Sequence, residues 1–383
     1  MPGLTQVAGI TPADTLQAET RAAAIRCIGN VVEACAQSCG TEEANRIFTT
    51  LMGMLGNIPY DDPAVLAIKE ASVNFAAGMK EVFAPFMQPL MTELIKDASS
   101  ELDLHLTDTD NPNNPEVGKN MEGVRIDLPG LGTKQITINT TALETKIKAV
   151  KILYDLVTSL EKNFSAYVEA TLQVLEPLFD YQHNDDIRKF SLKTASKALH
   201  CFDNSEKAEA FLRIMFPVIR GKIGEVFMTA PKDAKRLIGS LITSCTAVPS
   251  IAVIGLPEAV ETSKILASTV NKVFERKINR SHEKAKYQGD DVYYEELDIL
   301  QNEDDVDDEI VRGTMEIIGH FLKAFKQTYQ PTFTECFQTL YSQLFYKQGA
   351  SDIELLSAVC IFDDYVEHTG DAMVENGKSK VLE

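Results

Sequence analysis

The feature that most constrains this chain is a recurring pair of amphipathic helices. Within residues 141–201, apolar residues at helical spacing mark three segments, and the connections between these segments are short and polar. Asp185 opens the last segment, where an acidic residue is favoured as a helix cap. Long helices joined by short links form antiparallel hairpins. We expect helices over 15–37, 41–55, 63–80, 82–96, 142–160, 164–179, 185–199, 205–227, 231–246, 257–279, 307–329, 331–345 and 351–368.

The hairpins follow a regular period along the chain. Six intervals separate equivalent positions of alternate helices; four are 42–48 residues long, and the other two, 81 and 76, contain insertions. HEAT repeats recur at about 40–47 residues and stack into solenoids. The sequence therefore predicts an all-α fold, a HEAT-repeat superhelical solenoid of about seven helix pairs over residues 1–383. The equivalent positions are Arg21, Val65, Lys146, Arg188, Arg236, Arg312 and Glu354.

Two insertions and two tails depart from this period. Residues 97–140 contain two strand-like pieces, Val124–Leu128 and Gln135–Ile138, around a Pro- and Gly-rich turn. This pattern predicts an inserted loop that ends in a small β-hairpin. Residues 281–306 form an acidic insert. We expect residues 1–14 to be a loose tail and residues 370–383 to be a polar tail.

Charge and composition exclude several classes of protein. The net charge of −19 disfavours nucleic-acid binding, because phosphates are repelled, and it favours basic partners. Seven cysteines without a C-x-x-C pair indicate reduced thiols in the cytosol or nucleus. The chain has no signal peptide pattern at its start and no apolar run long enough to span a membrane. No metal or cofactor site has a sufficient set of ligands.

The acidic insert is the strongest local charge. Residues 287–310 hold eleven acidic and no basic side chains, and a basic stretch from Lys272 to Lys286 precedes them. Such a segment is either a solvated loop or an electrostatic lure that speeds encounter with a basic segment. The second interpretation makes these residues candidates for partner binding: Glu303, Asp304, Asp305, Asp307, Asp308 and Glu309.

Two stretches carry a resemblance to a known family. Residues 358–368 (AVCIFDDYVEH) resemble the Cys-Ile-Phe-Asp-Asp-x-x-Glu-His helix of the importin-beta superfamily, in its karyopherin beta-3 (importin five) subgroup. Residues 293–312 resemble the acidic insert that precedes this helix there. The resemblance implies a nuclear transport receptor that shuttles between cytoplasm and nucleus and is released by Ran in its GTP form. It would carry a basic cargo protein or nuclear localisation segment on a concave surface.

The same resemblance sets further expectations. Family members are much longer, and their N-terminal repeats make the main Ran contact, so we expect a middle section or a shortened relative that binds Ran-GTP weakly. We also expect a monomer. The acidic positions of the resembling helix join the candidates for partner binding: Asp363, Asp364 and Glu367.

Two alternatives remain open at this point. A HEAT scaffold of another kind, such as a phosphatase or trafficking adaptor, would show the same period. The Asp363-Asp364-x-x-Glu367 string also resembles the magnesium-diphosphate motif of isoprenoid synthases, which are all-α enzymes. That chemistry requires a second acidic helix facing the first, and no convincing second motif is present. The sequence therefore favours a non-enzymatic binding scaffold with no catalytic residues.

Overall fold

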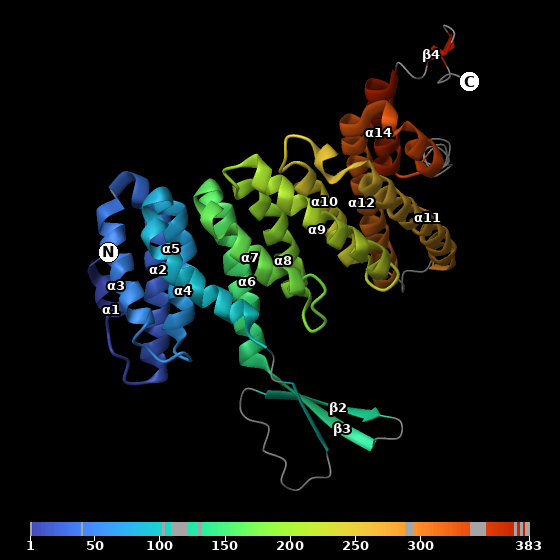
Figure 1. The fold of residues 1–383 in the computed structure, drawn as a ribbon. Helices are drawn as coiled ribbons and strands as arrows, with labels where there is room; N and C mark the ends of the chain where they lie inside the picture. Colours follow the sequence, from blue (N-terminus) through green and yellow to red (C-terminus); the bar gives the residue numbers. More distant parts are fainter. Residues whose placement is uncertain are drawn as a thin grey trace. The chain divides into compact units, whose positions relative to one another are not determined.

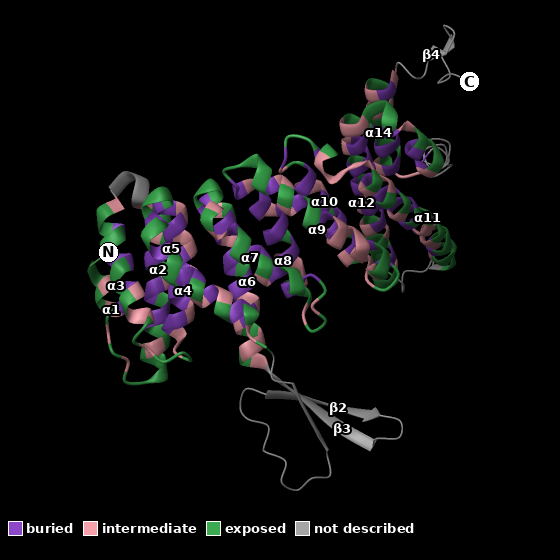
Figure 2. Cartoon of the chain, viewed as in Figure 1, coloured by how far each residue is buried: buried purple, intermediate pink, exposed green. Residues whose placement is uncertain are grey.

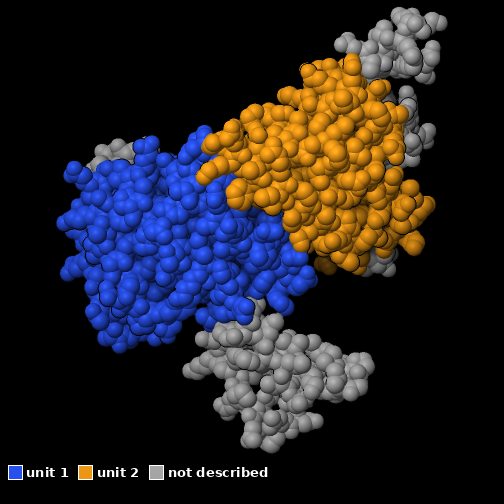
Figure 3. Space-filling model, in the orientation of Figure 1, with its two compact units in different colours: residues 1–203 blue, residues 204–383 orange. Residues whose placement is uncertain are grey.

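The computed structural model describes the chain in two compact units, residues 1–203 and 204–383 (Figure 3). Because each unit has its own core, each is described by itself below. The described residues are 2–39, 41–101, 104–108, 121–128, 132–287, 294–337, 350–370, 374–375 and 378–379.

The first unit is a stack of helix pairs (Figure 1). In it α2, α4, α6 and α8 pack against one another in succession, while α3 packs on α4, and α5 packs on α6 and α7. Each of the first four alternate positions expected from the sequence lies in one of these successive helices. The helices are α1 (Pro2–Ala8), α2 (Thr15–Cys39), α3 (Thr41–Leu55), α4 (Pro63–Met79), α5 (Ala84–Ser99), α6 (Thr140–Leu160), α7 (Val168–Leu175) and α8 (Asp185–Ala198).

Local chemistry sets the helix ends in this unit. Asp62 caps α4 by accepting the N–H of Ala64, and Pro63 occupies the first helical position, where a missing N–H costs nothing. The cap of α8 is Asn184, whose side chain accepts the N–H of Ile187 at 3.0 Å. The prediction that Asp185 is this cap was therefore wrong by one residue, since Asp185 is already helical.

Two other expectations for the first unit need correction. Residues 164–179 are not one helix: 3₁₀ turns at Glu161–Tyr167 and Glu176–Leu178 flank the short α7. Pro177 lies in the second turn, where it cannot donate to a continuing α-helix. The N-terminal tail is also not entirely loose, because residues 2–8 form α1, which packs on α2.

The first insertion contains three antiparallel strands, β1 (Leu104–Asp108), β2 (Met121–Leu128) and β3 (Gly132–Asn139), in the order β1-β3-β2. Leu128 pairs with Gly132 at one end of β2 and β3. The turn that the sequence predicts between these strands includes residues 129–131, which lie outside the described residues, so this detail of the hairpin stays a prediction.

The second unit repeats the helix-pair arrangement. In it α10, α12 and α14 pack in succession, and α9 packs on α10 and α11. The last three alternate positions of the sequence pattern lie in α10, α12 and α14. The helices are α9 (Ser205–Val226), α10 (Pro231–Cys245), α11 (Leu256–Tyr287), α12 (Tyr294–Phe325), a helix over 330–337 and α14 (Asp352–Thr369), with strands β4 (Val374–Glu375) and β5 (Lys378–Ser379) at the end.

The main correction in this unit concerns the acidic insert. A solvated loop, one of the two interpretations of residues 287–310, was wrong for most of the segment, because α12 begins at Tyr294. The insert expected over 281–306 also begins inside α11, which continues to Tyr287. Residues 288–293 lie outside the described residues, as do residues 338–349 of the helix expected over 331–345. The acidic residues therefore stand on a helix of 32 residues, where their side chains have a fixed periodic arrangement.

Buried residues lie where the helices of each unit face one another, and exposed residues lie on the outer sides (Figure 2). Most of the buried residues are apolar. In the first unit, the rings of Phe48, Phe75, Phe83 and Phe86 cluster between α3, α4 and α5, with the Phe48 and Phe75 ring centroids 4.5 Å apart. Burial of such rings supplies much of the free energy that holds stacked helix pairs together. No helix in the described ranges is both long and apolar enough to cross a bilayer.

Candidate functional site

The acidic residues of α12 face a basic stripe on α11. Arg276, Arg280 and Lys284 stand four residues apart on α11, so they lie on one face of the helix. Asp304 and Asp307 stand on the facing side of α12. The antiparallel pairing runs from Arg276 with Asp307, through Arg280 with both carboxylates, to Lys284 with Asp304.

Three contacts in this stripe are charge-assisted hydrogen bonds, and the contact of Arg276 with Asp307 is a longer ion pair. Arg280 Nη2 lies 2.7 Å from one oxygen of Asp304, and Lys284 Nζ lies 2.6 Å from the other. Arg280 also forms an ion pair with Asp307, and Arg276 Nη2 lies 3.5 Å from the second oxygen of Asp307. Both carboxylates are thus neutralised by their own chain, which stabilises the pairing of α11 with α12.

A third cation connects α11 to α14. Lys277 forms an ion pair with Asp308 of α12, and its Nζ lies 2.9 Å from Oε1 of Glu354 on α14. Glu354 is fully buried, and its other oxygen accepts the backbone N–H of Ser351 at 2.8 Å in the capping box of α14. Lys277 therefore connects α11 with both α12 and α14. Removing it would leave two carboxylates without their cation.

Burial and charge act in opposite directions on these groups. Burial raises the pKa of the Asp304 carboxyl, but hydrogen bonds from Lys284 and Arg280 outweigh burial and hold this pKa below its usual value. Asp307 has no exposed surface, and burial raises its pKa although Arg280 and Arg276 oppose the rise. A carboxylate this buried cannot contact a partner protein, so the role of Asp307 is to pair with the arginines of α11.

The candidate residues of α12 thus separate into two groups. Asp304, Asp307 and Asp308 are internal, with side-chain exposures of 19%, 0% and 10%. Asp305 is exposed, and Glu303 is half-exposed at the edge of the Arg280 pairs. The last candidate, Glu309, is one-third exposed and lies 2.6 Å from Arg312, one turn along the same helix. A partner could reach only the second group.

The candidates on α14 also differ among themselves. Asp363 and Glu367 are exposed, whereas Asp364 is half-buried. The Asp364 carboxyl lies against Gly319 of α12, so close that a Cβ at Gly319 would overlap one of its oxygens. Burial and the neighbouring Asp363 and Glu367 raise the pKa of Asp364, and His368 partly opposes this rise. Asp364 therefore belongs to the packing of α12 on α14, and the other two face solvent.

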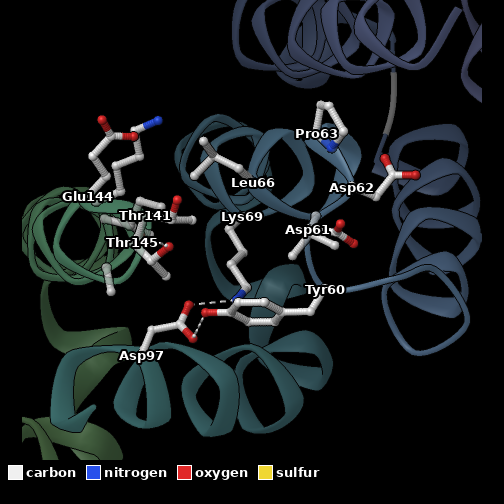
Figure 4. A pocket seen from close by; sticks show the side chains of 14 residues that line it. Tyr60, Asp61, Asp62, Pro63, Leu66, Lys69, Asp97, Thr141, Glu144 and Thr145 are labelled. Carbon is white, nitrogen blue, oxygen red and sulfur yellow. Dashed lines mark hydrogen bonds and ion pairs between the residues drawn. The ribbon is translucent and has the colours of Figure 1, made fainter. Parts of the chain in front are cut away.

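A small cavity in the first unit is a concave feature that the sequence did not indicate (Figure 4). Its volume is about 190 Å³, and it lies between the ends of α4, α5 and α6. Lys69 Nζ donates to Asp97 at 2.7 Å, and the Tyr60 hydroxyl donates to the other oxygen of Asp97 at 3.2 Å. Both charged groups are buried and neutralise each other, so this cluster holds α4 to α5.

The second concave feature of this unit surrounds a buried lysine. Lys146 donates to the carbonyl of Ala98 at 2.6 Å and lies over the Tyr181 ring, 5.4 Å from its centroid. Burial lowers the pKa of this lysine. Across the described ranges, no three His, Cys, Asp or Glu side chains come together as metal ligands would.

Comparison with solved structures decides the fold. No protein-family model matches the sequence. The structure of Kap121p bound to Ste12p matches 98% of this chain with a TM-score of 0.73 at 15% identity. Kap121p alone matches 96% with a TM-score of 0.71 at 16% identity. The fold is that of a karyopherin.

Kap121p bound to Pho4p shows the same likeness, with a TM-score of 0.70 and 16% identity over 98% of this chain. The prediction of an all-α HEAT array of karyopherin type is therefore confirmed. This chain spans about a third of the length of the karyopherin structures it matches, with 32–33% of each covered. At this level of identity the likeness establishes the fold, and function rests on the surfaces of the helices.

Proposed function

We propose that this chain is a non-enzymatic binding scaffold, a segment like a nuclear transport receptor, that binds basic segments of cargo proteins. The observation that carries the proposal is the karyopherin fold, because the matching structures are of Kap121p, captured with proteins such as Ste12p, Nup53p and Pho4p. A receptor of this kind works in both cytoplasm and nucleus, and no chemical step is needed for it.

We place the basic segment on the side of the second unit that α12 and α14 form. Exposed carboxylates supply the negative charge on this side. The internal carboxylates of α12 hold that helix against α11 through their ion pairs. Complementary charge at the rim of an interface mainly raises the association rate and weakens with salt. The partner-facing residues in this proposal are Glu303, Asp305, Glu309, Asp363 and Glu367, whereas Asp304, Asp307, Asp308 and Asp364 act through the packing of the helices.

The test is titration of a dye-labelled Lys-rich peptide, followed by fluorescence anisotropy. One variant neutralises three exposed carboxylates and the partly exposed Glu309: Asp305→Asn, Glu309→Gln, Asp363→Asn and Glu367→Gln. We expect severalfold weaker binding in about 0.1 M salt, where the Debye length is ~10 Å. The effect should be much smaller in about 0.5 M salt, where that length is only ~4–5 Å.

A matched control makes the same change in net charge elsewhere. Glu42, Glu81, Glu206 and Glu225 are exposed and stand on helices other than the alternate ones. Their replacement by Gln should leave the affinity within about twofold, because screening limits exposed charges to short range. Equal weakening by both variants would show a general charge effect and would contradict the proposed surface.

Ran binding is a separate prediction. A pull-down with Ran in its GTP form should retain little of this chain, and the Lys-rich peptide should stay bound when Ran-GTP is added. Tight binding of Ran-GTP by this chain would contradict the proposed partner surface.

A further inference from the structure

A basic, aromatic surface lies on α6 and α8 of the first unit, and one of its lysines, Lys148, also lines the cavity described above. These helices pack side by side in the first unit (Figure 1). Lysines at helical spacing follow the solvent-facing side of both helices, and none of them is buried. They are Lys148 and Lys151 on α6, and Lys189, Lys193 and Lys197 on α8.

Phe190 shows that the two rows of lysines form one surface. Its ring lies 5.8 Å from the ring of Tyr154, centroid to centroid, across the seam between α8 and α6. The ammonium groups of Lys151 and Lys189 lie 5.9 Å and 5.3 Å from the same ring centroid, one from each helix. Both rings are partly exposed, so the seam offers an aromatic platform flanked by cations.

The lysines of this surface lack carboxylate partners. Among the described residues, none of the five forms an ion pair, whereas four cations of α11 lie against carboxylates of α12 or α14: Arg276, Lys277, Arg280 and Lys284. The acidic residues of the same two faces are Glu144 and Asp186 near the helix starts, and Asp155. Burial raises the pKa of Asp155, with Lys151 opposing the rise. The middle of the surface therefore keeps a positive excess.

We propose that the face of α6 and α8 binds an acidic segment of a partner protein, with carboxylates on the lysines and an apolar or aromatic side chain on the Phe190–Tyr154 seam. Charge complementarity selects the partner, because five unpaired ammonium groups on one small surface attract a short run of carboxylates. Aromatic rings add contact area that a purely ionic site lacks.

A peptide fits this surface better than a nucleic acid does. The whole chain carries a net charge of −19, which repels a long polyanion in proportion to its length. A short acidic segment stays within about one Debye length, ~8 Å at physiological salt, of the lysines it contacts. Distant carboxylates of the chain are then screened from it.

The experiment measures binding of a dye-labelled Glu-rich peptide with one central Leu to the full chain. We expect the variant Lys151→Gln, Lys189→Gln, Lys193→Gln to bind roughly tenfold more weakly in about 0.1 M salt, because three exposed charge pairs are lost. The control variant replaces Lys232, Lys235 and Lys323, which are exposed in the second unit, with Gln. It makes the same change in net charge and should leave the affinity almost unchanged.

Two further measurements decide the nature of the partner. Phe190→Leu should weaken binding of the peptide severalfold in high salt as well as in low salt, because salt does not screen the loss of a ring contact. A single-stranded oligonucleotide of equal charge should bind more weakly than the peptide. Tighter oligonucleotide binding that depends on the same lysines would overturn the acidic-peptide proposal, as would equal peptide affinity for the lysine variant and its control.

This inference is independent of the proposed function. Binding of the Lys-rich peptide should be unaffected by the three lysine replacements. A chain that fails to bind basic peptides could still bind the acidic one, so each proposal can fail alone. Circular dichroism of every variant confirms that the helices are intact.

Discussion

Basic residues recur at helical spacing in two helix pairs, α11 with α12 and α6 with α8. Their surroundings differ between the two pairs. On α11 the cations meet a matching row of carboxylates on the next helix, with Lys284 Nζ 2.6 Å from Asp304. On α6 and α8 the cations face solvent around Phe190. The same residue type thus stabilises one helix pair and leaves the other open for binding, and the facing helix decides which.

The difference teaches that formal charge is a poor guide to a binding surface. The most acidic stretch of this sequence lies on α12, yet its three most buried carboxylates are neutralised within the chain. The surface of α6 and α8 is much less conspicuous in the sequence, but none of its five lysines forms an ion pair in the described ranges. Attraction of a partner depends on charge that remains unpaired after folding.

The largest expected effect is on the Arg280 pairs. Arg280→Ala should lower the free energy of unfolding of the second unit by about 3–5 kcal/mol, because the fully buried Asp307 loses its main cation. Urea denaturation followed by circular dichroism measures the change. Lys193→Ala on α8, a cation without an ion pair in the described ranges, is the matched control and should cost less than about 0.5 kcal/mol.

A second variant makes the test of this ion pair stricter. Replacing Arg280 and Asp307 together with Leu should recover much of the stability, since a buried pair is often no better than apolar side chains of similar volume. If Arg280→Ala and Lys193→Ala cost the same, the contrast between the two helix pairs would be lost.

The next effect concerns the close approach of α12 to α10. A Cβ on Gly313 would lie 2.6 Å from Cγ2 of Ile238, so Gly313→Ala should destabilise the second unit by about 1–3 kcal/mol. Gly239→Ala on α10 is the control, because a Cβ there meets no atom within 4 Å. That change should stabilise by about 0.5–1 kcal/mol through helix propensity. Thermal melts that shift in the same direction for both variants would contradict this packing.

The pH dependence of the α11–α12 pairing should follow Asp304. Its pKa is lower in the folded chain than its ordinary value of 3.8, so its contribution is complete above that value. The contribution is lost as the pH falls through the lowered pKa. Asp304→Asn should therefore cost about 1–2 kcal/mol at neutral pH and almost nothing at the acid end. A cost that is independent of pH would show that the charge of Asp304 does not matter.

Much of the fold could be predicted because the periodicity of apolar residues within each helix can be seen in a short stretch of sequence. Each of the seven alternate positions, from Arg21 to Glu354, lies in one of the successive helices α2 to α14. Boundaries were harder: Asn184 and Asp185 both suit a cap, and only the backbone geometry shows which one accepts the N–H of Ile187. Such choices depend on tertiary context that propensity does not contain.

The error in the acidic insert had a signal that could have prevented it. Cations at Arg276, Arg280 and Lys284 and carboxylates at Asp304 and Asp308 both recur at four-residue spacing, which indicates two helices rather than a loop. A count of charge alone suggested a solvated segment. By contrast, the burial of Asp307 could not be predicted, because it requires knowing which helix lies opposite.

The smallest expected effect is on the stability contributed by the lysines around Phe190. An exposed cation over an aromatic ring contributes about 0.5–1 kcal/mol. Lys151 and Lys189 share one ring, so repulsion between their ammonium groups offsets part of this gain. Lys151→Gln and Lys189→Gln, separately and together, should therefore change the free energy of unfolding by no more than about 0.5 kcal/mol. A double-mutant cycle in urea measures both the single costs and their coupling. A combined loss above about 1.5 kcal/mol would mean that these lysines hold α6 to α8, as Arg280 holds α12 to α11. The contrast between the solvent-facing lysines of α6 and α8 and the paired cations of α11 would then be wrong.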